Sequence, residues 1–321
     1  MIGDNLTVHG GINFHNHPCL PPEPPRQLPP LDACFLGRDK ELAKLVEQLH
    51  PDKVAAVCGP GGMGKSALAA QAVHRLEQGR FLDGIVFHSF YQKPRTDQAL
   101  QSIADAFQIE VKVGLVTAVQ TALAGKKALL IFDGAEEAED LKAVLDLRST
   151  CGVLITSRKR SDARGTRFDL QPLEDEPAVD VFCAYSGAAA DDAGVQGICT
   201  KLGGWPVALR IAGRYLSSTG ESTADYLRWL KQEPFKELGD GEHQEENAAL
   251  LLRRSVAQVN EDARLVLGLA GCLAFATLAV APIMALLEDD ERRRRTAVNE
   301  LVNYGLLERR KERLHIGHAL I

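Results

Sequence analysis

The sequence has 321 residues, 45% of them hydrophobic and 25% charged, with a formal net charge of −6. This balance is typical of a soluble globular protein of about two or three domains, and it excludes both wholesale disorder and a whole-chain basic surface for nucleic acid. The sequence contains no run of about 18 uncharged apolar residues, so we expect no membrane-spanning helix. The seven scattered cysteines include no CxxC pair, so we expect reduced thiols and a cytoplasmic protein.

Residues 1–33 are predicted to form a β-hairpin and a proline-rich linker. Apolar and polar residues alternate on both sides of Gly10 and Gly11, a pattern typical of a hairpin with a two-residue turn. Residues 18–30 hold seven of the 15 prolines, which favours an extended, semi-stiff linker. Four side chains of metal-binding types also occur here, but their spacing fits no familiar zinc pattern, and solvated residues are the favoured interpretation: His9, His15, His17 and Cys19.

Residues 34–171 alternate strand patterns with helix patterns. This order predicts an α/β fold, a parallel sheet with helices on both faces. Strands are predicted at residues 54–58, 85–90, 128–132, 153–156 and 167–170, and helices at residues 39–49, 65–76, 97–107, 115–123 and 136–147.

The strand patterns stop after Pro172. Residues 172–246 are predicted to be a helical domain with glycine turns near residues 187, 204 and 220, followed by a polar loop at residues 239–247. Residues 247–321 hold further helices and then two short strands at residues 306–309 and 313–316, an order that favours a winged-helix domain.

A glycine-rich motif carries the clearest chemical signal. Residues 59–66 read GPGGMGKS and match GxxxxGK[ST] between a strand and a helix, the setting that a phosphate-binding loop requires. We expect backbone N–H groups to face phosphate oxygens, with Lys65 reaching the β- and γ-phosphates and Ser66 binding Mg²⁺. The alternative is a glycine-rich turn without a ligand. The predicted nucleotide-binding residues of this segment are Gly59, Gly61, Gly62, Met63, Gly64, Lys65, Ser66 and Ala67.

An acidic residue follows the strand at residues 128–132. Asp133 would lie at the carboxyl edge of the sheet, where it is predicted to hold the metal, although it could instead cap the next helix. Gly134 leaves no acid at the adjacent position. Glu136 or Glu137 would therefore polarise water, and we favour Glu136, while either could simply suit the helix dipole.

The next strand ends at Arg158. Its guanidinium is predicted to pair with the γ-phosphate and so report its presence. The alternative is a solvated basic loop formed by Arg158, Lys159 and Arg160.

Taken in order, these residues resemble the NB-ARC branch of the STAND NTPases, and the resemblance runs over residues 35–321. Phe35, Leu36 and Arg38 are similar to the opening segment that lies against the adenine. Residues 202–209 resemble the Gly-Leu-Pro-Leu segment, which places its nucleotide-packing proline at Pro206. Residues 314–321 resemble the Met-His-Asp segment, which places its phosphate-sensing histidine at His318; a capping or surface histidine is the alternative.

The resemblance implies a nucleotide switch that uses ATP, ADP and Mg²⁺. With ADP, His318 and Pro206 would hold the three domains together; with ATP, Arg158 would engage the γ-phosphate and a self-association surface would open, giving a ring or helical oligomer. Gly134 in place of a second acid implies slow ATPase activity at most, and Ala319 in place of the motif's aspartate implies a weaker ADP latch.

The family context leaves partners and pathway open. Unknown sensor and effector partners are implied, in signalling, antiviral defence or regulated cell death, with neither membrane nor nucleic acid expected as a partner. STAND proteins usually carry a sensor after the winged helix, so we expect this sequence to be a fragment.

Two other functions remain open. A DNA-binding winged-helix regulator would use the arginines at residues 292–295 ahead of an amphipathic helix, although the acids at residues 288–291 nearly cancel them. A non-hydrolysing nucleotide-bound scaffold would differ from the ATPase only at Glu136 and Glu137. A kinase on the same loop would need an acceptor pocket, for which the sequence has no signal.

Overall fold

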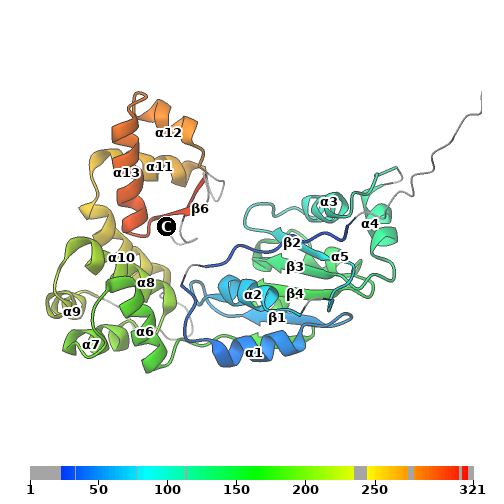
Figure 1. Ribbon diagram of the computed structural model, residues 1–321, viewed down its shortest axis with the longest axis horizontal. Helices are drawn as coiled ribbons and strands as arrows, with labels where there is room; N and C mark the ends of the chain where they lie inside the picture. Colours follow the sequence, from blue (N-terminus) through cyan, green and yellow to red (C-terminus); the bar gives the residue numbers. More distant parts are fainter. Residues whose placement is uncertain are drawn as a thin grey trace, which may run out of the picture.

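The computed structural model describes residues 23–32, 34–77, 79–112, 114–234, 244–273, 278–310 and 313–316. The predicted N-terminal hairpin, with His9, His15, His17 and Cys19, lies outside these residues, as does His318. The described chain forms a sheet-containing lobe beside an all-helical region, above which stand three helices and a small hairpin (Figure 1). No helix in the described ranges is both long and apolar enough to cross a bilayer.

The central sheet has five parallel strands in the order β2-β3-β4-β1-β5. Its strands are β1 (Val54–Cys58), β2 (Ile85–Ser89), β3 (Leu129–Asp133), β4 (Gly152–Ser157) and β5 (Thr166–Asp169). Every residue of β4 is buried, as is all of β3 except its last residue. The continuous apolar runs of the sequence therefore became strands covered on both faces.

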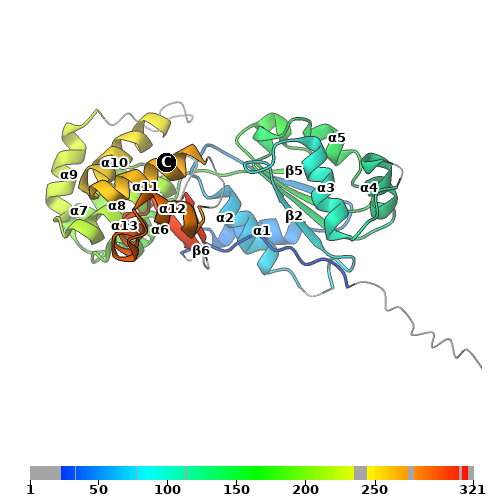
Figure 2. The ribbon, with the colours of Figure 1, turned by 90° about the horizontal axis from the view of Figure 1, so that it is seen from above.

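Helices cover both faces of the sheet, as the sequence predicted (Figure 2). Leu129 and Ile131 of β3 join the core under one layer of helices, and Leu130 and Phe132 join the core under the other, because successive side chains of a strand point to opposite faces. The first layer holds α1 (Asp39–Gln48) and α2 (Lys65–His74); the second holds α3 (Thr96–Ala106), α4 (Leu115–Leu123) and α5 (Leu141–Leu145).

The single helix predicted over residues 136–147 is wrong. A 3₁₀ turn (Ala135–Glu137) follows β3, and α5 begins only at Leu141. Ala138 adopts an extended conformation, and the Asp140 carboxylate accepts a hydrogen bond from the Ala143 N–H and caps α5. The cap at Asp140 thus starts a new helix at Leu141 and interrupts the longer helix that the sequence pattern predicted.

The proline-rich segment is extended, as predicted, but it is also packed against the sheet. Pro25 C=O accepts a hydrogen bond from Ile85 N–H at 2.6 Å, and Gln27 N–H donates to Ile85 C=O at 2.9 Å. Pro29 is buried, and its carbonyl lies 2.9 Å from His74 Nε2 of α2. The segment therefore lies along the sheet edge and pairs with β2 through one parallel bridge, between Arg26 and Ile85.

Four helices follow the sheet, in agreement with the helical pattern predicted after Pro172: α6 (Asp175–Ser186), α7 (Ala193–Lys201), α8 (Pro206–Thr219) and α9 (Thr223–Gln232). Pro206 occupies the first turn of α8, and Gly220 ends that helix in the left-handed conformation. The next helix, α10 (Gln244–Gln258), packs on α8 and begins inside the predicted loop. The predicted domain boundary at residues 246 and 247 also falls within α10.

The C-terminal part contains α11 (Glu261–Cys272), α12 (Val280–Leu286), α13 (Glu291–Asn303), β6 (Leu307–Arg310) and β7 (Arg313–Ile316). The strands pair antiparallel and close to the predicted positions. Three helices followed by a hairpin are the order expected of a winged helix, which stays a prediction. Arg210 of α8 pairs with Glu308 at 2.8 Å, and Arg214 donates to Val302 C=O, so this part is tied to α8.

An aromatic cluster joins α10 to its neighbours. The Arg254 guanidinium lies 3.8 Å from the ring centroid of Trp229, stacks against Tyr215 and Tyr226, and donates to both oxygens of Glu221.

We predict that Arg254→Ala lowers the free energy of unfolding by about 2–4 kcal/mol, because it removes the stacking and leaves a half-buried carboxylate without its partner. Chemical denaturation checks this value. Arg253→Ala, which changes the exposed neighbouring arginine, is the matched control and should shift stability by less than about 0.5 kcal/mol. Equal losses in the two variants would contradict the role of the cluster.

Candidate nucleotide-binding site

The glycine-rich loop connects β1 to α2. Gly62 and Gly64 have φ angles of +74° and +87°, which glycine adopts without a side-chain penalty. A side chain at Gly62 would collide with Val207, and Trp205 Nε1–H donates to Gly61 C=O at 3.0 Å. The segment leading into α8 therefore packs directly against the loop.

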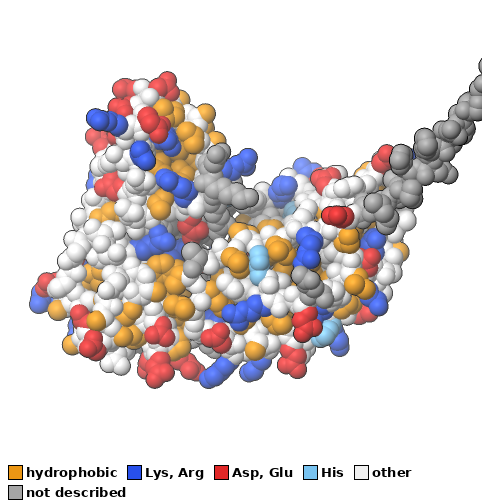
Figure 3. All heavy atoms as spheres, viewed as in Figure 1, with side chains coloured by type: hydrophobic (Ala, Val, Ile, Leu, Met, Phe, Trp, Pro, Cys, Tyr) orange, Lys and Arg blue, Asp and Glu red, His pale blue; other side chains and the backbone are white. Residues whose placement is uncertain are grey.

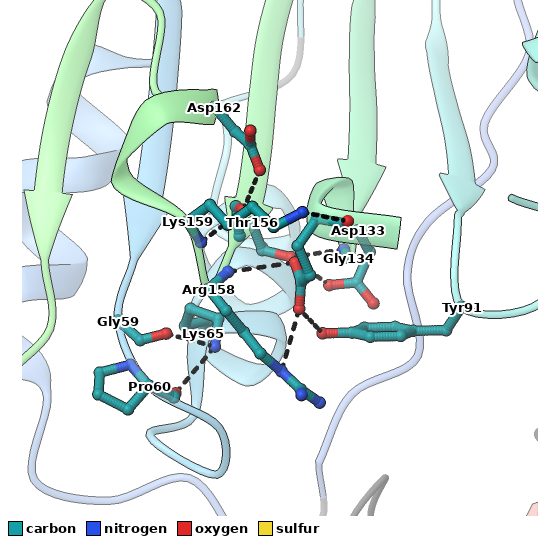
Figure 4. A network of polar contacts seen from close by, with 12 residues as sticks. Gly59, Pro60, Lys65, Tyr91, Asp133, Gly134, Thr156, Arg158, Lys159 and Asp162 are labelled. Atoms are coloured by element: carbon teal, nitrogen blue, oxygen red, sulfur yellow. Dashed lines mark hydrogen bonds and ion pairs between the residues drawn. The ribbon is translucent and has the colours of Figure 1, made fainter. Parts of the chain in front are cut away.

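Lys65 lies at the start of α2 with a side chain that is only 6% exposed. Its Nζ donates to the carbonyls of Gly59 and Pro60, both at 2.9 Å (Figure 4). Burial lowers the pKa of Lys65 to about 8, and the nearby Glu136 carboxylate opposes the shift. The ammonium group is thus held at the phosphate-binding loop but is poorly solvated, a condition that a polyphosphate would relieve.

Asp133 ends β3 beside the loop. Ser66 and Thr156 hydroxyls donate to its carboxylate, the latter at 2.6 Å, and Thr156 Oγ1 in turn accepts the Gly134 N–H at 3.0 Å. Burial raises the pKa of Asp133, and the two hydroxyls oppose this. The predicted metal ligands Ser66 and Asp133 are therefore adjacent, and their hard oxygen atoms suit Mg²⁺. Thr156, whose role the sequence did not reveal, orients the carboxylate.

The two acids considered for water activation are separated by the structure. Glu136 has a side chain that is only 4% exposed, and its Oε1 accepts a hydrogen bond from the Tyr91 hydroxyl at 2.6 Å. Its Oε2 accepts the Arg158 N–H at 3.1 Å, and Arg158 Nε lies 3.1 Å from Oε1. Glu137 is exposed. Glu136 is thus paired with Arg158, the predicted γ-phosphate sensor.

Tyr91 is a site residue that sequence reasoning missed. It follows β2 at the same edge of the sheet where Asp133 ends β3, and that placement is the signal that could have found it. A Cβ atom at Gly134 would lie 2.5 Å from its ring. The Tyr91 ring therefore fills the space next to residue 134. Burial, followed by the Glu136 charge, raises the pKa of Tyr91, so its hydroxyl stays a donor.

Arg38 contacts the loop through a buried hydrogen bond to its backbone. Its side chain is 5% exposed and donates to the carbonyls of Met63 at 3.2 Å and Gln171 at 2.8 Å, and it pairs with Glu41. The arginine of the opening segment thus fixes the position of the phosphate-binding loop in addition to lining the cavity.

A cavity of about 370 Å³ joins these groups, and the surface is hollowed between the sheet and the C-terminal helices (Figure 3). Leu173 and Tyr185 come from the helical part, and Glu308, His315 and Ile316 come from the C-terminal hairpin. The predicted site residues that line it are Phe35, Leu36, Arg38, Gly61, Gly62, Met63, Gly64, Lys65, Ser66, Ala67, Asp133, Arg158 and Pro206.

Two predicted residues stand apart from that lining, and a third lies outside the described residues. Gly59 begins the loop, and its carbonyl accepts a hydrogen bond from Lys65 Nζ. Glu136 lies behind Arg158 and Tyr91. His318 is outside the described residues, while His315, which the sequence did not single out, lines the cavity from β7.

A parallel sheet with this loop after β1 and an acid at the end of β3 defines a P-loop nucleotide-binding protein. Residues 38–192 match the NB-ARC domain family. These residues, about half of the chain, form an NB-ARC domain of the P-loop ATPase type. The resemblance found in the sequence is thereby confirmed.

Relatives and solved structures agree with this assignment. The chain is 27% identical over 223 residues to the regulatory protein AfsR of Streptomyces griseus and 25% identical over 231 residues to that of Streptomyces coelicolor; each match covers 63% of this chain and 23% of the relative. It therefore spans about a quarter of the length of these curated relatives. A STAND protein with a tetratricopeptide repeat sensor from Pyrococcus horikoshii shares the fold, with a TM-score of 0.59 at 16% identity over 91% of this chain and 42% of that chain.

The clash at residue 134 gives a stability prediction. Gly134→Ala should lower the free energy of unfolding by about 3 kcal/mol, because a side chain at φ +73° is strained and collides with the Tyr91 ring. Gly125→Ala is the matched control, since Gly125 has φ +72° but open space around it. It should cost only about 1 kcal/mol. Thermal unfolding of both variants measures the difference, and equal losses would mean that the ring does not restrict residue 134.

The low pKa of Lys65 gives a pH prediction. A bound polyphosphate stabilises the ammonium form and raises this pKa, so binding takes up a proton once the pH exceeds about 8. Between pH 6.5 and 7.5 Lys65 stays protonated, so its titration should leave nucleotide affinity nearly constant. Above pH 8 the affinity should fall by up to about tenfold per pH unit. Calorimetry in buffers of different ionisation enthalpy measures the proton uptake. No uptake at pH 9 would show that Lys65 does not titrate on binding.

Proposed function

We propose that this chain is the ATP- and ADP-binding switch of a signalling protein, with slow ATPase activity. The observation that carries the proposal is the composition of the cavity wall, to which the phosphate-binding loop, α8 and the β6–β7 hairpin all contribute. A ligand in this cavity contacts three parts of the chain at once. Its terminal phosphate can therefore bias how those parts are arranged, since a ligand shifts an equilibrium only through differential contacts.

Each phosphate-facing group has a specific task in the proposal. Backbone N–H groups of the loop and the Lys65 ammonium would bind the β- and γ-phosphates. Ser66 and Asp133 would hold Mg²⁺, which neutralises phosphate charge. The apolar end, with Phe35, Leu36 and Pro206, would take the adenine. The burial of Glu136 and its pairing with Arg158 and Tyr91 support slow hydrolysis, because they restrict the access of water to the carboxylate.

The proposed readout is self-association. Arg210 and Glu308 line the cavity and join α8 to β6, so displacing the hairpin would change the surface that the C-terminal part presents. We propose a winged-helix role for that part, a head-to-tail ring or helical assembly with ATP, and unknown sensor and effector partners. The regulatory name of the AfsR relatives supports regulation as the pathway class. Antiviral defence and regulated cell death remain alternatives within signalling, and the cytoplasm is the proposed location.

The DNA-binding alternative has less support. Arg293 pairs with Asp262 and Glu288, and Arg294 pairs with Glu291, so two of the four arginines are already engaged by acids. A duplex would have to break these ion pairs to use the arginines. The non-hydrolysing scaffold differs from the switch in having no phosphate release, which a steady-state assay with ATP and Mg²⁺ detects directly.

The experiment that tests the switch compares Lys65→Ala with the unmodified protein. We expect at least about a hundredfold weaker ATP and ADP binding, because the variant removes the buried ammonium group that lies on the carbonyls of Gly59 and Pro60. Light scattering should also show no ATP-dependent increase in particle mass. Lys53→Ala is the control, since Lys53 is exposed before β1. Unchanged nucleotide affinity in Lys65→Ala would refute the site, and a constant particle mass of the unmodified protein would refute self-association.

A further inference from the structure

The structure places Arg158 between two acceptors. Its Nε lies 3.1 Å from Glu136 Oε1, while its Cζ lies beside the phosphate-binding loop, 3.9 Å from the position of a Cβ on Gly61. The side chain is 31% exposed and lines the cavity, whereas its carboxylate partner does not. In Figure 4 the side chain of Arg158, the residue after β4, runs between Lys65 and Tyr91.

The carboxylate partner is fixed in place. The Tyr91 hydroxyl and the Arg158 backbone N–H each donate to one of its oxygens. The backbone is also held, because Lys159 Nζ donates to the Glu136 carbonyl at 3.0 Å. Glu136 therefore cannot follow the guanidinium if that group turns toward the cavity.

The guanidinium, by contrast, is held loosely. The Nε–H of Arg158 is not aligned with the carboxylate well enough to form a hydrogen bond, so the pair is an ion pair alone. Among the described residues, no oxygen accepts a hydrogen bond from its two Nη atoms. A phosphate oxygen at the loop would offer those nitrogens a bidentate partner, the arrangement that guanidinium groups favour.

We propose that Glu136 competes with the terminal phosphate for Arg158 and thereby sets the preference of the site between nucleoside triphosphate and diphosphate. This inference rests on the proposed nucleotide-binding function. In this proposal the terminal phosphate binds the two Nη atoms and turns the guanidinium away from Glu136, and that exchange costs part of the binding free energy of the triphosphate. A diphosphate has no terminal phosphate at that position and leaves the ion pair intact.

The competition also gives Tyr91 a task. Because its hydroxyl fixes Oε1, Tyr91 is a positioning residue that keeps the competing carboxylate beside Arg158. The exchange would uncover Glu136 at the moment when the γ-phosphate is engaged, so access of water to this acid would depend on the same contact that senses the nucleotide.

The test measures the ratio of two affinities in Glu136→Gln, with the non-hydrolysable analogue β,γ-imido-ATP and with ADP as probes, in the presence of Mg²⁺. The amide keeps the shape of the side chain but loses the charge that holds Arg158. We expect about tenfold tighter binding of the analogue and less than about twofold change for ADP. Glu137→Gln removes the same charge from the exposed adjacent residue and should alter neither affinity by more than about twofold.

A double-mutant cycle with Arg158→Ala separates competition from simple repulsion between Glu136 and phosphate. In the Arg158→Ala background, Glu136→Gln should no longer tighten the analogue. Tightening that persists there, or equal tightening of ADP, overturns the competition while leaving the nucleotide-binding function standing. Failure of the unmodified protein to bind either probe overturns the proposed function itself. Circular dichroism of each variant confirms that it is folded before the affinities are compared.

Discussion

The contact between the phosphate-binding loop and the segment leading into α8 is the constraint on which the site depends. Trp205 donates its indole N–H to Gly61, and Val207 fills the space over Gly62, where only a hydrogen atom fits. The backbone conformation that presents N–H groups to phosphates is therefore supported from outside the sheet. Because that support comes from the helical part, a shift of α8 relative to the loop would remove it.

Each charged side chain near this contact is paired with another group of the protein. Lys65 lies on loop carbonyls, Asp133 is held by Ser66 and Thr156, and Arg158 shares Glu136 with Tyr91. Each pair offers one partner that a nucleotide could replace. The charged side chains are thus positioned before a nucleotide binds, and binding would exchange their protein partners for phosphate or metal.

The sequence predicted the sheet and the loop well, because both depend on local patterns. The strand at residues 54–58 and the helix at residues 115–123 were placed to the residue. Partners supplied by distant segments were not predictable. Nothing near Glu136 in the sequence indicates that Tyr91 and Arg158 enclose it, and the helix predicted there failed because Asp140 starts a new one.

The packed proline-rich segment has a mechanical consequence. Residues 23–32 complete the sheet edge at Ile85, and Pro29 and Pro30 of the same segment form part of the cavity wall. A force applied to the chain ahead of residue 23 would be carried by two backbone hydrogen bonds before it reached that wall. Because Pro29 and Pro30 line the cavity, displacing this segment from the sheet edge would change the wall that a bound nucleotide contacts.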